Sequence, residues 1–197
     1  MRGDFLSVLP ESLETARLLI RCIRPGDGVM MQAAVVESYE DLKPWLAWVA
    51  LDFPLEEAEQ NCRTFYARFL LNESLVALFI DKATGELIGG SGYNTVDWSL
   101  RQFEVGYWRR TGWGGQGLMT EGVRALAGYA LEQLGASRVY LTVDNKNTAS
   151  CRLAERCGFQ LEGILRNERL NLQGGLRDTR VYSRIPVAAD VVADPVV

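Results

Sequence analysis

The sequence predicts an α+β fold, in which helices flank a mixed, mostly antiparallel central sheet. Strand-like and helix-like periodicities are interspersed along the chain, an apolar run at 103–108 leads through a glycine-rich turn into a helix, and two strand-like segments close the sequence as a hairpin. The 197 residues, 48% of them hydrophobic, can bury one sizeable core. We therefore expect a single domain over residues 1–185 and a flexible C-terminal tail over 186–197.

The first half of the chain is predicted to supply one strand, two helices and a hairpin. The first strand carries apolar side chains on both faces, as a strand covered on both sides would. The second helix repeats apolar side chains at helical spacing, and three glycines in the last strand indicate a bulge or a close backbone approach. These elements are a strand at 17–24, helices at about 27–37 and 55–71, and strands at 75–80 and 86–94, with a connection over 95–102.

The second half is predicted to continue as strand, helix, strand, short helix and hairpin. Gly135 is in the position of the glycine that commonly follows a helix, and Asn147 is a good N-cap for the short helix. A Gln-Gly-Gly turn joins the last two strands. The elements are a strand at 103–108, a helix after the glycine turn, a strand at 138–143, a short helix ending near 157–158, and strands at 159–172 and 176–185.

The glycine-rich turn predicts an anion site. Four glycines fall between Gly112 and Gly117, and the helix that follows would direct its unpaired N–H groups to the same point. A purely structural tight turn is one alternative. A dinucleotide fingerprint, and with it an oxidoreductase, is another, although Glu104 inside the strand and Glu132 inside the helix fit it poorly. A P-loop is excluded, because no Gly-Lys-Ser/Thr follows.

Composition narrows the classes of function. The net charge of −4 argues against a nucleic-acid binder. No apolar run approaches the length of a membrane span and no signal peptide is recognisable, so we expect a soluble, cytoplasmic protein with no membrane partner. Histidine is absent and the four cysteines have no metal-like spacing, so we expect no metal and buried, reduced thiols.

Several motifs in order closely resemble the GNAT superfamily of acyl-CoA N-acyltransferases. Within it they are similar to the Rim-type branch, which acetylates the N-termini of ribosomal proteins. The resemblance covers roughly residues 13–185. The motifs are Glu104-Val-Gly-Tyr-Trp, Gly114-Gly-Gln-Gly-Leu-Met-Thr-Glu121, Asn147-x-x-Ser150, Gly158-Phe159 and Leu161-Glu-Gly-x-Leu-Arg166.

The resemblance implies acetyl-CoA as co-substrate, with its pantetheine arm between two splayed strands, here 103–108 and 138–143. The pyrophosphate motif of the family falls on 114–119 and keeps its fourth-position glycine, Gly117, but departs at its first and last positions. Since backbone N–H groups bind the phosphate, these departures leave the site in place. The expected cofactor-binding residues are Tyr107, Trp108, Arg109, Gly114, Gly115, Gln116, Gly117, Leu118, Met119, Thr120 and Asn147.

The acceptor amine needs a proton sink. An α-amine with a pKa of about 8 is roughly one-tenth neutral at pH 7, whereas a lysine amine near 10.4 is almost wholly protonated. Without histidine, a carboxylate or a water chain ending on one must take the proton. Glu104 beside the thioester position is the first candidate, and Glu168 in the last hairpin is the second, as in some Rim-type enzymes.

Three further residues complete the predicted site. The tyrosine that serves many GNAT enzymes as the acid is replaced by Ala154, and Ser150 would take the role by donating a hydrogen bond to the departing thiolate. A first-turn helix cap is the structural alternative for Ser150. In Rim-type enzymes the segment similar to 44–48 borders the acceptor pocket, which makes Trp45 and Trp48 candidate substrate contacts, with core packing or a lid over the core as their alternative.

The acceptor itself stays open at this stage. The branch resemblance favours a protein N-terminus, but an aminoglycoside, a polyamine or a free amino acid would suit the same scaffold. A module that holds acyl-CoA without turnover is a further alternative, and a homodimer is compatible with the sequence.

Overall fold

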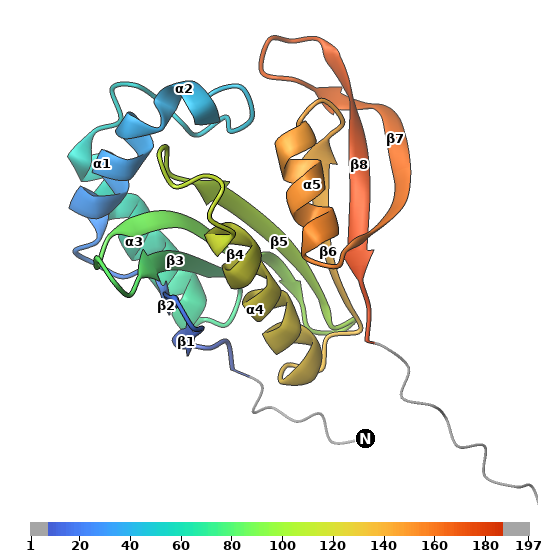
Figure 1. The fold of residues 1–197 in the computed structure, drawn as a ribbon, viewed down its shortest axis with the longest axis horizontal. Coiled ribbons are helices and arrows are strands. Elements are labelled where there is room, and N and C mark those ends of the chain that lie inside the picture. The colour runs from blue at the N-terminus through green and yellow to red at the C-terminus, as the bar shows by residue number, and fades with distance from the viewer. Residues whose placement is uncertain (1–7, 187–197) are drawn as a thin grey trace, which may run out of the picture.

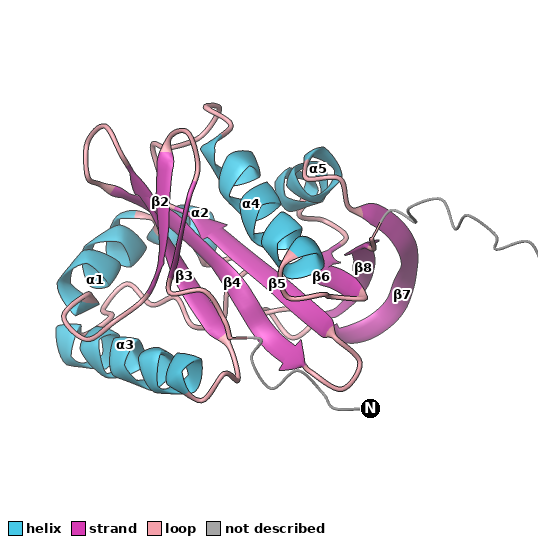
Figure 2. Ribbon diagram, turned by 90° about the horizontal axis from the view of Figure 1, so that it is seen from below, coloured by secondary structure: helices cyan, strands magenta, loops and turns pink. Residues whose placement is uncertain are grey.

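The computed structural model describes residues 8–186, which form a sheet with helices on both faces (Figures 1 and 2). The strands are β1 (Ser12–Glu14), β2 (Leu18–Cys22), β3 (Leu75–Asp81), β4 (Leu87–Asp97), β5 (Gln102–Arg109), β6 (Arg138–Asp144), β7 (Gln160–Leu170) and β8 (Leu176–Arg184). The helices are α1 (Gly28–Glu37), α2 (Tyr39–Leu42), α3 (Leu55–Leu70), α4 (Leu118–Glu132) and α5 (Thr148–Arg156).

Within this part of the chain the sheet order is β1-β2-β3-β4-β5-β6-β8-β7. All neighbouring strands pair antiparallel except β5 and β6, which are parallel and connected through α4. Figure 2 shows α1 and α3 on one face of the sheet and α4 and α5 on the other. The predicted α+β class with a mixed, mostly antiparallel sheet is therefore confirmed.

The core is divided by the sheet, as the first predicted strand required. Ile20 of β2 faces the cluster under α4 and α5, whereas Ile23 just beyond the strand packs in the cluster under α1 and α3. Tyr93 of β4 is fully buried, and its hydroxyl donates to the carbonyl of Leu126 at 2.8 Å. This bond joins the middle of α4 to the sheet.

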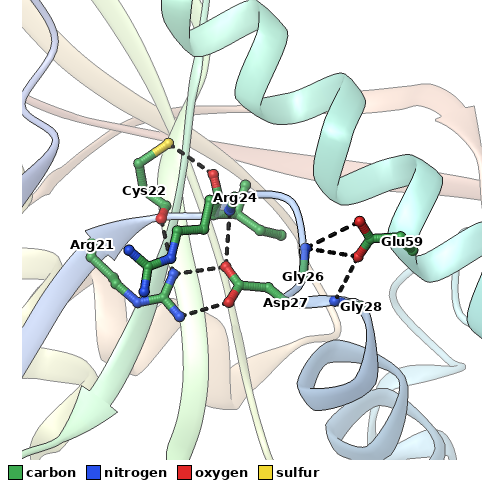
Figure 3. Close-up of polar contacts among 8 residues, drawn as sticks. Arg21, Cys22, Arg24, Gly26, Asp27, Gly28 and Glu59 are labelled. Carbon is green, nitrogen blue, oxygen red and sulfur yellow. Dashed lines mark hydrogen bonds and ion pairs between the residues drawn. The ribbon is translucent and has the colours of Figure 1, made fainter.

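The turn between β2 and α1 is held by a partly buried polar network (Figure 3). Both guanidinium Nη atoms of Arg21 donate to the Asp27 carboxylate at 2.7 Å, and the Arg24 amide donates to the same group at 2.9 Å. Glu59 of α3 accepts from the amides of Gly26 and Gly28. The network fixes α1 against α3, and α2 follows α1 directly in the chain.

Two short elements escaped prediction, and one boundary was wrong. The strand β1 has three residues and the helix α2 a single turn, too short for a periodic signal. The expected connection at 95–102 is partly strand, because β4 continues to Asp97. Leu70, placed by its spacing on the apolar face of α3, is 65% exposed at the end of the helix.

The expected irregularity of β4 is present. Its pairing with β3 shifts register at Phe79/Ile80, and a Cβ at Gly92 would lie 1.8 Å from the carbonyl oxygen of Leu75. A second shift, against β5, leaves Asn94 as an extra residue between Tyr93 and Thr95. Both the bulge and the close backbone approach are confirmed.

The closing hairpin has the predicted strands, with β7 at the edge of the sheet. The tail proposed for 186–197 lies, from residue 187 onward, outside the described residues. The single domain over 1–185 stays a prediction.

Candidate active site

A cleft of about 1170 Å³ is lined by residues of β5 and β6. Across the described residues these strands pair only at Gln102–Arg138, Phe103–Val139 and Glu104–Tyr140, after which β6 continues beside β8. Both α4 and α5 contribute to its walls, through their first turns among other residues. The splay predicted for these two strands is thus present and opens on the glycine turn.

The glycine turn has the backbone that an anion site requires. Gly112, Gly115 and Gly117 have φ of +87°, +78° and +76°, a conformation that L side chains rarely adopt. Gly117 is the N-cap of α4, and no side chain caps this helix. The N–H groups of the first turn are therefore left for the cleft, which Leu118, Met119 and Thr120 line.

Arg17 and Glu121 hold the turn in place, a pairing that sequence reasoning missed. The Arg17 guanidinium donates to the carbonyl of Gln116 at 2.9 Å and to the Glu121 carboxylate at 2.7 Å. Burial opposes ionisation of Glu121, but hydrogen bonds from Thr15 and Arg17 outweigh it and lower the pKa of Glu121. The Gln116 side chain, by contrast with its expected role, does not line the cleft.

Four arginine side chains line the cleft and could face the cofactor phosphates: Arg17, Arg109, Arg124 and Arg156. Arg109 was predicted and the others were not. Arg124 on α4 donates to the carbonyl of Arg156 at the end of α5, so the two helices present their cations together. These charges suit a polyanionic ligand although the protein is acidic overall.

Two hydroxyl groups meet across the gap between β5 and α5. Ser150 Oγ lies 3.0 Å from Tyr107 Oη, and Tyr107 Oη donates to the Ser150 carbonyl, also at 3.0 Å. Burial raises the pKa of Tyr107, so its hydroxyl stays protonated. The side-chain cap of α5 is Asn147, whose Oδ1 accepts from the Ser150 amide at 3.1 Å. Both Asn147 and Ser150 line the cleft, and the capping alternative for the Ser150 hydroxyl is wrong.

Glu104 lies at the last position of β5 that pairs with β6, and it lines the cleft. One of its carboxylate oxygens accepts from the Thr95 hydroxyl at 3.1 Å, and it has no salt-bridge partner among the described residues. The other oxygen is available to a ligand. Asn94 on the adjoining strand lines the same wall and was not predicted.

Glu168 lies outside the residues that line the cleft. A bulge in β7 places it beside Thr179, whose hydroxyl donates to it at 2.9 Å, and beside Arg169, with which it forms an ion pair. The hydrogen bond from Arg169 lowers the pKa of Glu168. This arrangement makes Glu168 a weaker base than an unpaired carboxylate.

The two predicted substrate tryptophans have different positions. Trp45 lines the cleft together with Asp41, Leu42 and Leu46, all from α2 or the turn after it. Trp48 does not line the cleft, but packs edge-on against the cleft residue Trp108, with ring centroids 6.3 Å apart. Trp45 is 36% and Trp48 47% exposed, so neither belongs to the core; the core-packing alternative is wrong, and the lid over the core stays a prediction.

Two features are absent from residues 8–186. No cluster of three or more potential metal-ligating side chains is present there. None of the helices in that range has the length and apolar character needed to span a bilayer.

Comparison with known proteins identifies the family. The family model of the acetyltransferase (GNAT) domain matches residues 17–160. The N-acetyltransferase YoaA of Bacillus subtilis is 30% identical over 87% of this chain and 94% of its own length. A ribosomal-protein-serine acetyltransferase of Escherichia coli is 27% identical over 73% of this chain and 80% of its own length.

A solved structure has the same fold. RimL, a ribosomal-protein α-N acetyltransferase in complex with coenzyme A, superposes with a TM-score of 0.82 at 21% identity, covering 89% of this chain and 98% of its own. The dinucleotide interpretation of the glycine turn is thereby overturned, since β5, the turn and α4 are parts of an acetyltransferase domain. The chain belongs to the GNAT family and is an acetyl-CoA-dependent N-acetyltransferase.

Proposed function

We propose that this enzyme acetylates the N-terminal α-amine of a protein, with a ribosomal protein as the first candidate. The glycine turn, which suits acetyl-CoA, lines the same cleft as Trp45 and Glu104, to which we assign the acceptor amine. The printed name of the Escherichia coli relative, a ribosomal-protein-serine acetyltransferase, supports this class of acceptor. The acceptor protein is then the principal partner, and a homodimer stays a prediction.

One observation carries the proposal. A carboxylate and a hydroxyl, Glu104 and Ser150, line the same cleft from β5 and α5, on either side of the gap where the pantetheine arm would lie. Attack of the amine forms an N–C bond and breaks the C–S bond of the thioester. The ammonium proton passes to Glu104, directly or through water, and the departing sulfur receives a hydrogen bond from Ser150.

The division of roles follows from the partners of each group. We assign the role of general base to Glu104 because it lines the cleft with one carboxylate oxygen unpaired, whereas Glu168 is paired with Arg169. In the structure the single proton of the Ser150 hydroxyl is donated to Tyr107 Oη, so Ser150 can donate to the sulfur only when Tyr107 Oη turns from the Ser150 carbonyl and donates to Ser150 Oγ. A serine hydroxyl is a far weaker acid than a thiol with a pKa of about 8.5, so it stabilises the thiolate without giving up its proton fully.

An α-amine and a lysine amine differ in pKa, and therefore in how readily each loses its proton to the base. A side-chain amine with a pKa near 10.4 is about two orders of magnitude less often neutral at pH 7 than an α-amine near 8. With Glu104, a half-buried carboxylate, as the base, the enzyme favours the amine that loses its proton readily.

Mass spectrometry with purified enzyme and acetyl-CoA tests the proposal. One peptide set has a free N-terminus and no lysine, and a matched set has a blocked N-terminus and one lysine. We expect acetylation of the first set, at the α-nitrogen, and no reaction of the second. Modification of the lysine set alone, or of polyamines and aminoglycosides but neither peptide set, would contradict the proposal.

A further inference from the structure

The glycine of the Glu-Val-Gly-Tyr-Trp motif is not explained by its backbone. Gly106 lies in the middle of β5 without a positive φ. A Cβ at this position would lie 2.3 Å from Nδ2 of Asn94 and 3.1 Å from its Cγ and Oδ1. The space of the missing side chain is thus occupied by the Asn94 amide, which lies flat on β5.

The bulge of β4 puts Asn94 there. Tyr93 pairs with Val105 and Thr95 pairs with Glu104, so that Asn94 has no residue opposite it. The side chain is exposed, lines the cleft, and has no hydrogen-bonding partner among residues 8–186. A side-chain amide that lies against Gly106 without a hydrogen-bonding partner, beside the candidate base, is available to a substrate.

The spacing matches an extended peptide. Gly106 and Glu104 are two residues apart on one face of β5, a separation of about 7 Å. An α-amine at Glu104 places the nitrogen of the second residue about 3.6 Å away along the acceptor. In an extended residue the N–H and the C=O point to the same side, and a carboxamide offers one acceptor and one donor to that pair.

We propose that the Asn94 amide binds the N–H and C=O of the second residue of the acceptor, as a neighbouring strand would. This inference rests on the proposed function and narrows it. The substrate class is an extended N-terminal peptide of at least two residues, and Gly106 is glycine so that Asn94 can adopt this position. Asn94 acts in specificity, while Glu104 takes the proton.

A substrate and variant cycle tests the inference. The acceptors are a lysine-free peptide and its ester analogue, in which oxygen replaces the first amide N–H. For each enzyme the ratio of kcat/KM for peptide over ester is measured. The different amine pKa values of the two acceptors cancel when ratios are compared between enzymes.

We expect Asn94→Ala to lower this ratio about tenfold relative to the wild type, the value of one lost hydrogen bond with its partner left unpaired. Gly106→Ala should lower it similarly by displacing Asn94, and the double variant should be no worse than Gly106→Ala. The exposed α3 variant Gln60→Ala is the matched control and should keep the wild-type ratio. Acetyl-CoA affinity, measured by calorimetry, should be the same in Asn94→Ala, Gln60→Ala and the wild type.

An unchanged ratio in Asn94→Ala would overturn the inference while leaving the proposed function intact. The inference would also be overturned if Asn94→Ala had no effect while Gly106→Ala lowered the ratio equally in the wild type and in the Asn94→Ala variant. The methyl group would then obstruct the acceptor directly. If the wild type acetylates neither peptide nor ester but acetylates a simple amine, the proposed function fails and the inference fails with it.

Discussion

Removing the Tyr107 hydroxyl tests whether the hydroxyl pair serves chemistry. Tyr107→Phe deletes two hydrogen bonds of 3.0 Å, one with Ser150 Oγ and one with the Ser150 carbonyl. At about 1 kcal/mol each, the free energy of unfolding should fall by about 2 kcal/mol. Because burial keeps Tyr107 protonated, this loss should not depend on pH through the neutral range.

The kinetic effect should be separable from the loss of stability. Without Tyr107 the Ser150 hydroxyl is free to rotate away from the sulfur, and we expect kcat to fall about tenfold, or about 1.4 kcal/mol of barrier. Acetyl-CoA affinity should change less than twofold. Ser150→Ala should lower kcat by at least as much, since it removes the donor itself.

The double variant decides the matter. If Tyr107 acts through Ser150, the kcat of Tyr107→Phe/Ser150→Ala should equal that of Ser150→Ala alone. The control is Tyr93→Phe, which loses one buried hydrogen bond, to Leu126, and should lose about 1 kcal/mol of stability without a change in kcat. Additive kinetic losses in the double variant, or a kcat loss in the control, would refute the reasoning.

Two further predictions concern the glycine turn. Gly117→Ala and Gly174→Ala impose similar strain, because the two glycines have φ of +76° and +80°, and each should cost about 1–2 kcal/mol of unfolding free energy. Measured by calorimetry, only Gly117→Ala should weaken acetyl-CoA binding. Equal binding by both variants would remove the turn from the site. Glu121→Gln should lose about 1 kcal/mol at pH 7. Since the folded pKa of Glu121 is lowered from 4.5, the stabilisation by its carboxylate is complete above that pH and is lost as the pH falls through the folded pKa. In urea unfolding, the stabilities of the variant and the wild type should therefore converge in acid. A stability difference that stays constant with pH would contradict the ion pair.

Local regularities made much of the fold predictable. The helix α3 and the strands around the glycine turn have clear hydrophobic periods. Glycine is the residue that adopts a positive φ most readily, so the glycines of the turn indicate its backbone conformation from the sequence alone. The single-turn α2 and the three-residue β1 form because tertiary neighbours hold them. Segments of three or four residues are too short to carry a sequence pattern that predicts them.

The site shows the same division. Ser150 and Asn147 were found because a cap and a motif are local in sequence. The contact between Arg17 and Glu121 joins residues 104 positions apart, and no local pattern encodes it. Asn94 was missed because its position depends on a one-residue bulge between two strands, which register alone determines.

The central claim is that Glu104 takes the proton from the attacking amine, and the pH–rate profile of Glu104→Gln tests it most directly. The amide keeps the size of the side chain and its contact with Thr95 but cannot accept a proton. With an N-terminal peptide as acceptor, we predict that kcat/KM falls about 10²-fold or more at pH 7 and recovers in part toward the pKa of the amine, while acetyl-CoA affinity is unchanged. Glu168→Gln, the matched control, should stay within about threefold of the wild type, because a tenfold change would already require 1.4 kcal/mol of transition-state stabilisation. A wild-type rate in Glu104→Gln together with a large loss in Glu168→Gln would contradict the account and assign the base to the β7 bulge.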